Sequence, residues 1–183
     1  ITNSTIQSSI SMVSVIAERA NFSGTYFNID NYFDGSDFRN TNWDGANIRG
    51  SWFRACDFTG ASFSGTGARE TIFQGSNFQN ANINTANFRG ANFREANLAG
   101  ARISNCNTAD QSFNEAKFKY AYLASSVWNN VTICGAVDWE NAIFTDTDPE
   151  TGGTIYTTLL NVSGPDCYLY YANAKVEPDP DEL

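Results

Sequence analysis

The sequence predicts an all-β solenoid, a chain wound into square coils of about twenty residues, and three observations predict it. Every fifth residue from Phe33 to Ile133 is large and apolar at nineteen of twenty-one positions, the exceptions being Ala68 and Thr108. The residue two positions before each large one is small or nearly so up to Ala101, and glycine often stands two positions after it. A strand repeats every two residues and a helix every 3.6, so a period of five indicates a chain that turns after every repeat.

The period of five also defines the coil. The large and the small side chain of each repeat must face one axis, so four repeats and four turns close one coil. Successive coils then stack as parallel strands about 4.8 Å apart, and each coil touches only its neighbours. We expect about six coils, regular from Phe33 to Ile133, in which residues twenty apart share a column. One such column is Ile48, Ala68, Phe88, Thr108 and Trp128.

Residues 1–19 precede the repeat and are expected to cap its first coil. Ile6, Ile10, Val13 and Ile16 are spaced four, three and three residues apart, which predicts a short amphipathic helix. A cap is expected because the end of a solenoid exposes unpaired backbone groups.

The repeat region is expected to span residues 20–145, and residues 146–183 to form a non-repeat C-terminal cap with an acidic tail. Phe27 and Phe33 are six residues apart instead of five. One extra residue should therefore bulge out near Asp30–Tyr32.

The net charge of −9 belongs to the C-terminal part of the chain. Residues 1–137 hold ten acidic and ten basic residues, whereas residues 138–183 hold ten acidic residues against Lys175 alone. This pattern predicts no basic nucleic-acid surface. No stretch is long and apolar enough to span a membrane, and no signal peptide is recognisable at the start, so we expect no membrane insertion.

The sequence offers no residues for catalysis, cofactor binding or metal binding. Histidine is absent, which removes the commonest general base and metal ligand. The paired-cysteine zinc pattern and the phosphate-binding glycine loops are absent as well. The acidic stretch Asp146–Glu150 does not match the spacing of a calcium loop, so a solvated loop is expected. We therefore predict a protein that is not an enzyme.

Outward residues twenty apart should form rows along the solenoid, and two rows suggest a protein-binding surface. An arginine ladder lies on one face, and an apolar stripe flanked by further arginines lies around the adjacent corner. Exposed aromatic side chains beside arginine are typical of interface anchors. The alternative is that the N-terminal helix covers the stripe with Ile6, Ile10 and Val13. The predicted partner-binding residues are Tyr32, Arg49, Trp52, Arg54, Arg69, Ile72, Arg89 and Arg94.

The four cysteines divide into two pairs. Cys56 and Cys106 occupy small inward positions two and a half coils apart, so they are expected to be buried free thiols on opposite faces. Cys134 lies outward on the last regular coil and Cys167 lies in the non-repeating tail, and we predict a disulfide between them. The alternative is two unrelated free thiols. A disulfide would indicate an oxidising or redox-regulated compartment.

The repeats resemble those of a known family. Residues 86–90 (Ala-Asn-Phe-Arg-Gly), 91–95 (Ala-Asn-Phe-Arg-Glu) and 96–100 (Ala-Asn-Leu-Ala-Gly) are similar to the A-(D/N)-(L/F)-x-x unit of the pentapeptide-repeat family. The resemblance covers about two thirds of the chain in one register. It implies a right-handed quadrilateral β-helix.

The resemblance also implies a function. A capped coil, an acidic tail and a late cysteine pair resemble the pentapeptide-repeat proteins of the chloroplast thylakoid lumen, a group without an established catalytic role. This implies a non-enzymatic scaffold or interaction protein, such as an accessory factor or subunit of a photosynthetic membrane complex. It would act as a monomer or as a single copy in a larger assembly.

Two other functions remain open. Some pentapeptide-repeat proteins resemble duplex DNA and act on the topoisomerase gyrase, but mimicry needs negative charge along the rod, and here residues 1–137 are neutral. The other possibility is a solenoid without a single partner, in the periplasm or outside the cell.

Overall fold

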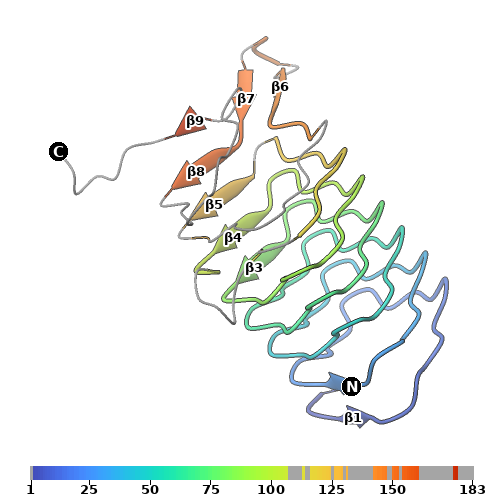
Figure 1. Cartoon of the computed structure of the whole chain (residues 1–183). Coiled ribbons are helices and arrows are strands. Elements are labelled where there is room, and N and C mark those ends of the chain that lie inside the picture. The colour runs from blue at the N-terminus through green and yellow to red at the C-terminus, as the bar shows by residue number, and fades with distance from the viewer. Residues whose placement is uncertain are drawn as a thin grey trace.

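The computed structural model confirms that the chain is a β-solenoid. Figure 1 shows its coils stacked along one axis, with β1 (Thr5–Ile6) at one end and β8 (Thr158–Leu160) and β9 (Lys175–Val176) at the other. None of the described residues form a helix, so this part of the chain contains no helical span that could cross a membrane. The described residues are 2–106, 113, 116–124, 126–129, 131, 142–147, 150–152, 154–160 and 175–176.

Consecutive coils pair in parallel at one position on each of four sides, so the coil is quadrilateral. In the regular part the paired residues are twenty apart: Tyr32 with Trp52, Asp37 with Asp57, Asn42 with Ser62, and Asn47 with Gly67. We number the faces by their large inward residues. The first is centred on Phe33, Phe53, Phe73 and Phe93, the second on Phe38, Phe58 and Phe78, the third on Trp43, Phe63 and Ile83, and the fourth on Ile48, Ala68 and Phe88.

Named strands occur where the pairing extends over several residues. The third face carries a parallel sheet in the order β3 (Asn82–Asn84), β4 (Arg102–Ser104), β5 (Val127–Asn129), β8 and β9. On the fourth face, β1 pairs in parallel with β2 (Tyr26–Phe27).

The core is a continuous column of aromatic rings. On the first face, Phe33 stacks on Phe53 with ring centroids 4.5 Å apart, and Phe53 stacks on Phe73 at 5.6 Å. Rings of adjacent faces meet edge to face, as Phe73 and Phe78 do at 5.1 Å and 82°. Stacked and edge-to-face contacts are the favoured geometries of aromatic pairs, so the period of five places ring upon ring along the first and second faces.

The two side chains that precede each large residue along the repeat make hydrogen bonds that shape the coil. The small inward hydroxyls donate to carbonyl groups of the previous coil, for example Thr66 Oγ1 to the Trp43 oxygen at 2.8 Å. Buried hydroxyls that find such acceptors carry no unsatisfied polar group into the core. The asparagine or aspartate before the large residue accepts the backbone N–H two residues later, as Asn92 Oδ1 does from Arg94 at 3.0 Å. These Asx turns bend the chain on each face.

The N-terminal helix predicted for residues 1–19 is wrong. The described residues of this segment are extended and form the outermost coil, in which Ser11 pairs in parallel with Tyr32. The N–H of Met12 donates to the carbonyl oxygen of Tyr32 at 2.7 Å. The coil edge offers unpaired backbone groups that an extended segment satisfies, whereas the serines of this segment have little preference for a helix.

The bulge predicted near Asp30–Tyr32 is confirmed by the pairing on either side of it. Tyr26 pairs with Asn47, twenty-one residues on, and Tyr32 pairs with Trp52, twenty residues on. The extra residue therefore lies between positions 26 and 32. Asp30 there has a φ of +63°, a left-handed conformation that aspartate tolerates better than most residues.

The regular twenty-residue register predicted from Phe33 to Ile133 holds as far as Ile103, which pairs with Ile83, and is wrong beyond it. Asn92 pairs with Lys117, twenty-five residues on instead of twenty. Likewise, Phe88 stacks on Phe113, with ring centroids 5.0 Å apart. Five additional residues therefore lie between the two coils.

The column predicted to contain Phe88, Thr108 and Trp128 is corrected by the same step. Phe113 takes the place over Phe88, and Trp128 pairs with Ile103 on the third face. Position 108 itself lies outside the described residues. The physical reason is that Phe113 supplies an aromatic ring that stacks on Phe88, which the side chain of a threonine does not offer.

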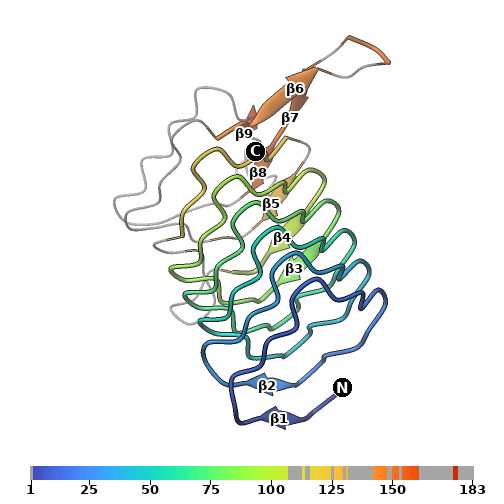
Figure 2. The ribbon, with the colours of Figure 1, turned by 90° about the vertical axis from the view of Figure 1, so that its right-hand side faces the viewer.

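A hairpin interrupts the last coils. It consists of β6 (Thr145–Thr147) and β7 (Thr154–Tyr156), which pair in antiparallel orientation, and Figure 2 shows it projecting beyond the stack. At its base, the buried Thr157 Oγ1 donates to the carbonyl oxygen of Leu123 at 2.8 Å. The assignment of residues 146–183 to a C-terminal cap stays a prediction, because much of this segment lies outside the described residues.

Candidate protein-interaction surface

The eight predicted partner-binding residues fall into three parallel rows around one corner of the rod. Neighbours within each row lie on neighbouring coils or two coils apart. The arginine ladder on the fourth face consists of Arg49, Arg69 and Arg89, the aromatic row on the first face consists of Tyr32, Trp52 and Ile72, and the basic row beside it contains Arg54, Gln74 and Arg94. The aromatic row therefore lies between two rows of arginines.

The aromatic row is a continuous apolar strip on the outside of the coil. Tyr32 is paired with Trp52, and Trp52 with Ile72. The Tyr32 and Trp52 rings lie 5.7 Å apart between centroids at an angle of 45°. Tyr32 is 39% exposed and the other two are partly exposed, so their apolar surfaces are accessible to a partner.

The alternative in which the N-terminal segment covers this strip is wrong. The outermost coil continues the row with Ser11 instead of crossing it. Ile6 and Ile10 pack against the core, and Val13 is itself half exposed. The strip is therefore not covered by residues 2–19.

Arg54 joins the aromatic row to the basic row. Its guanidinium carbon lies 4.6 Å from the centroid of the Trp52 ring, a cation–π contact. Its Nε donates to Asp34 Oδ2 at 2.9 Å, and this hydrogen bond raises the pKa of Arg54. Asp34 Oδ1 also accepts the backbone N–H of Arg54 at 2.8 Å. These contacts hold the Arg54 and Trp52 side chains in place without removing them from solvent, because half of the Arg54 side chain remains exposed.

An ion pair lies at one end of the arginine ladder. Arg49 forms an ion pair with Glu70, with Nη2 and Oε2 3.1 Å apart. The Nε atoms of Arg69 and Arg94 are buried and find no hydrogen-bond acceptor among the described residues. Like charges one coil apart repel, so this surface favours a negatively charged partner.

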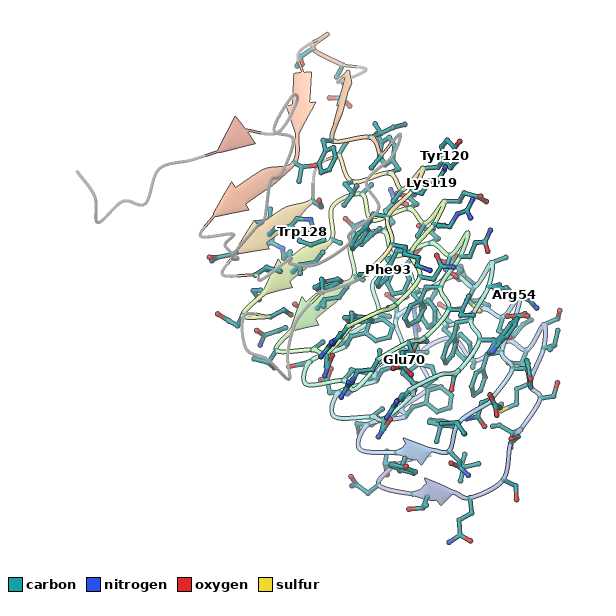
Figure 3. All side chains as sticks on the ribbon, viewed as in Figure 1. Arg54, Glu70, Phe93, Lys119, Tyr120 and Trp128 are labelled. Atoms are coloured by element: carbon teal, nitrogen blue, oxygen red, sulfur yellow. The ribbon has the colours of Figure 1, made fainter. Side chains whose placement is uncertain are left out.

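Two functional candidates were missed by the sequence analysis because of the extra five residues. Lys117 pairs with Asn92 and so extends the line of the aromatic row, and the carbonyl of Lys119 accepts the N–H of Glu95, which places Lys119 beyond Arg94 in the basic row. Figure 3 shows Arg54 and Lys119 along the same edge of the stack. The signal that could have placed them was Thr108, the polar break in the column of large residues.

Charge is distributed unevenly around the described coils. On the first and fourth faces, seven basic residues outnumber four acidic ones: Arg49, Arg54, Arg69, Arg89, Arg94, Lys117 and Lys119 against Asp30, Asp34, Glu70 and Glu95. On the other two faces, four acidic residues outnumber three basic ones: Glu18, Asp37, Asp44 and Asp57 against Arg19, Arg39 and Arg102. The surface with the three rows is thus the positive side of a chain that is negative overall.

The cysteines inside the coil are structural. Cys56 and Cys106 are free and buried, as predicted. Burial raises the pKa of Cys56 to about 12 and that of Cys106 to about 11, so both stay protonated at neutral pH. The predicted disulfide partners Cys134 and Cys167 lie outside the described residues. Within the described part of the chain, no group of three or more potential metal-binding side chains comes together.

Comparison with known proteins agrees with the repeat pattern. The family model described as "Pentapeptide repeat region" matches residues 46–123. No curated protein sequence matches the chain significantly.

Several solved structures are similar to this chain. A trypsin-treated variant of QnrB1, a plasmid-mediated fluoroquinolone resistance protein, has a TM-score of 0.56 and 19% identity, covering 98% of this chain and 93% of its own. HetL, a pentapeptide repeat protein involved in heterocyst differentiation regulation in Nostoc sp. strain PCC 7120, has a TM-score of 0.53 and 16% identity, covering 88% and 72%. A pentapeptide repeat protein from the Arabidopsis thaliana thylakoid lumen has 21% identity over 66% of this chain and 81% of its own, with a TM-score of 0.27.

At these identities, the likeness to QnrB1 and HetL shows the fold alone, because one fold serves many functions. The fold of pentapeptide-repeat proteins is a right-handed quadrilateral β-helix. The period of five and the parallel pairing at twenty-residue intervals agree with the family match, so residues 46–123 of this chain form a pentapeptide repeat region.

Proposed function

We propose that this chain is a non-enzymatic interaction protein that binds a protein partner through the three rows. The observation that carries the proposal is the aromatic row between two rows of arginines, left uncovered by the N-terminal coil. Aromatic and arginine side chains dominate the binding energy of protein interfaces. The rod supports them rigidly, because each coil is hydrogen-bonded to the next.

The finer proposal is an accessory factor or subunit of a photosynthetic membrane complex in the thylakoid lumen. It is supported by the layout of the chain, in which a repeat region is followed by an acidic segment and a late pair of cysteines. Oxidation of that pair would suit a compartment in which disulfides form.

Cross-linking mass spectrometry on native material tests the partner. Cross-links from the first or fourth face to subunits of a photosynthetic complex are the expected result. Cross-links confined to the second and third faces would place docking elsewhere on the rod and contradict the proposed surface.

Paired variants test the surface itself. Trp52→Ala with Arg69→Ala should weaken partner binding at least about tenfold, because truncating an interface anchor typically costs more than 1 kcal/mol. The matched control is Ile16→Ala with Arg102→Ala, two exposed side chains on the second and third faces. Equal binding by both double variants would show that the rows take no part in docking.

A DNA mimic that acts on gyrase is the alternative, and the charge of the rod argues against it. Mimicry needs negative potential along the rod, whereas the three rows lie on its positive side. A gyrase supercoiling assay separates the two functions. Inhibition of supercoiling, or protection of gyrase from quinolones, would favour the mimic, and an unaffected reaction is expected.

A further inference from the structure

We propose that the three rows bind an acidic segment of polypeptide with an apolar anchor. The apolar side chain would pack on the aromatic row, and carboxylates on both sides of it would reach the arginine ladder and the basic row. This inference rests on the proposed function and adds the chemistry of the partner.

The order of the three rows indicates the chemistry of the ligand. Trp52 and Ile72 offer apolar surface in the middle, while Arg49 on one side and Arg54 on the other remain half exposed despite their ion pairs. A ligand that matches this pattern must be apolar at its centre and negative at its edges. Lys119 extends the same pattern along the rod.

The ion pairs within the chain also indicate this chemistry. Arg49 and Arg54 have close carboxylate partners, at 3.1 Å and 2.5 Å, whereas Arg94 has a looser one and its side chain is 40% exposed. The contact of Arg94 with Glu95 is long, at 4.0 Å. A carboxylate is the preferred partner of a guanidinium, because it accepts two parallel hydrogen bonds.

The acidic residues of the surface select a polypeptide over a continuous polyanion. Asp34, Glu70 and Glu95 are interspersed among the bases, and the whole chain carries a net charge of −9. Duplex DNA carries a negative charge about every 1.7 Å, so it would meet these carboxylates as well as the arginines. A peptide can place its few carboxylates opposite the arginines only, and it supplies the apolar side chain that the aromatic row requires.

Fluorescence anisotropy with the full chain tests the inference. The first probe is a labelled twelve-residue peptide with Phe and Leu at its centre and Asp and Glu on either side. The second probe carries Lys at the acidic positions, and the third keeps the acids but carries Ser at the centre. The expected result is binding of the first probe alone, weakened by added salt because charge pairs at a surface are screened.

Substitutions in the rows test whether the first probe binds there. Arg54→Ala with Arg94→Ala, and separately Trp52→Ala, should each weaken binding of the first probe at least about tenfold, while Arg102→Ala on the third face leaves it unchanged. Melting temperatures measured for all variants ensure that lost binding is not lost folding. Equal binding of the lysine probe, or binding that survives the loss of both arginines, would overturn the inference.

Two further outcomes separate this inference from the proposed function. If a native partner depends on Trp52 and Arg69 but neither salt nor the first probe displaces it, the acidic chemistry is wrong and the docking surface stands. If neither the native partner nor any probe depends on the rows, both are wrong. The remaining candidate ligand is the acidic tail of a second copy of this chain, and sedimentation equilibrium tests it by measuring self-association. If the chain self-associates and removal of residues 177–183 abolishes this, the rows bind that tail and the inference is overturned.

Discussion

Replacement of Phe78 tests the register on which every other statement about this rod depends. Phe78 is fully buried on the second face. Four other phenylalanine rings surround it, with centroids 4.9 Å away for Phe58, 5.1 Å for Phe73, and 5.5 Å for both Phe63 and Phe93. Truncation therefore leaves a cavity against three faces at once.

The magnitude follows from that environment. Phe78→Ala should lower the free energy of unfolding by about 3–5 kcal/mol, the usual cost of removing a buried phenylalanine. For a chain of this size, 1 kcal/mol corresponds to about 2–4 °C in Tm, so the midpoint should fall by about 6–20 °C. Phe78→Asp would add an unpaired charge to the core and should prevent folding of the coil.

Thermal and urea unfolding followed by circular dichroism measure the effect. The control is Gln79→Ala, an exposed position one residue further on, which should change stability by less than about 0.5 kcal/mol. A normal melting curve for Phe78→Asp, or equal losses for the two alanine variants, would refute the inward assignment of Phe78 and with it the register.

Two further predictions concern the corners and the surface ion pairs. Gly60→Ala and Gly75→Ala both place a side chain at a φ near +68°, at a cost of about 1–2 kcal/mol each. Gly60→Ala should lower Tm slightly more, because its Cβ would lie 2.6 Å from the side-chain oxygen of Asn40, which must rotate away, whereas Gly75 has open space; a larger loss at Gly75 would contradict the geometry. Asp37→Asn keeps an oxygen for the Asx turn but loses the ion pair with Arg39 (Nη2 to Oδ2, 2.7 Å), so stability at pH 7 should fall only slightly in this largely solvated pair. Because the hydrogen bond from Arg39 lowers the pKa of Asp37, the wild-type advantage should be complete well above the ordinary carboxyl pKa and disappear as the pH falls through the lowered pKa. Urea titrations at several pH values measure the advantage, and a difference that grows towards low pH would contradict the assignment.

Much of the fold could be predicted from the sequence because the repeat is local. A large residue every five positions dictates which side chains face the axis, and the structure buries Phe33, Phe58 and Phe93 as that period requires. The same period places Trp52 and Arg69 outside, so the rows of the candidate surface follow from the register without knowledge of the contacts.

The N-terminal segment shows where the pattern was insufficient. Ile6, Ile10, Val13 and Ile16 match a helical spacing, but they also match an extended coil in which Val13 and Ile16 are outward. Val13 is 52% and Ile16 84% exposed. The choice depends on the neighbouring coil, whose free backbone groups pair with this segment, and that neighbour is not visible in the spacing of one segment.

By itself, the sequence determined the period, the inward and outward positions, and the corner at which aromatic and arginine side chains meet, because these depend only on residues a few positions apart. The tertiary structure decided the step of twenty-five residues that brings Lys117 and Lys119 to that corner. The physical reason is that the ring of Phe113 stacks on that of Phe88, a contact that a threonine does not offer. It also decided that residues 2–19 leave the aromatic row uncovered, since the backbone pairing of Ser11 with Tyr32 depends on the path of the first coil.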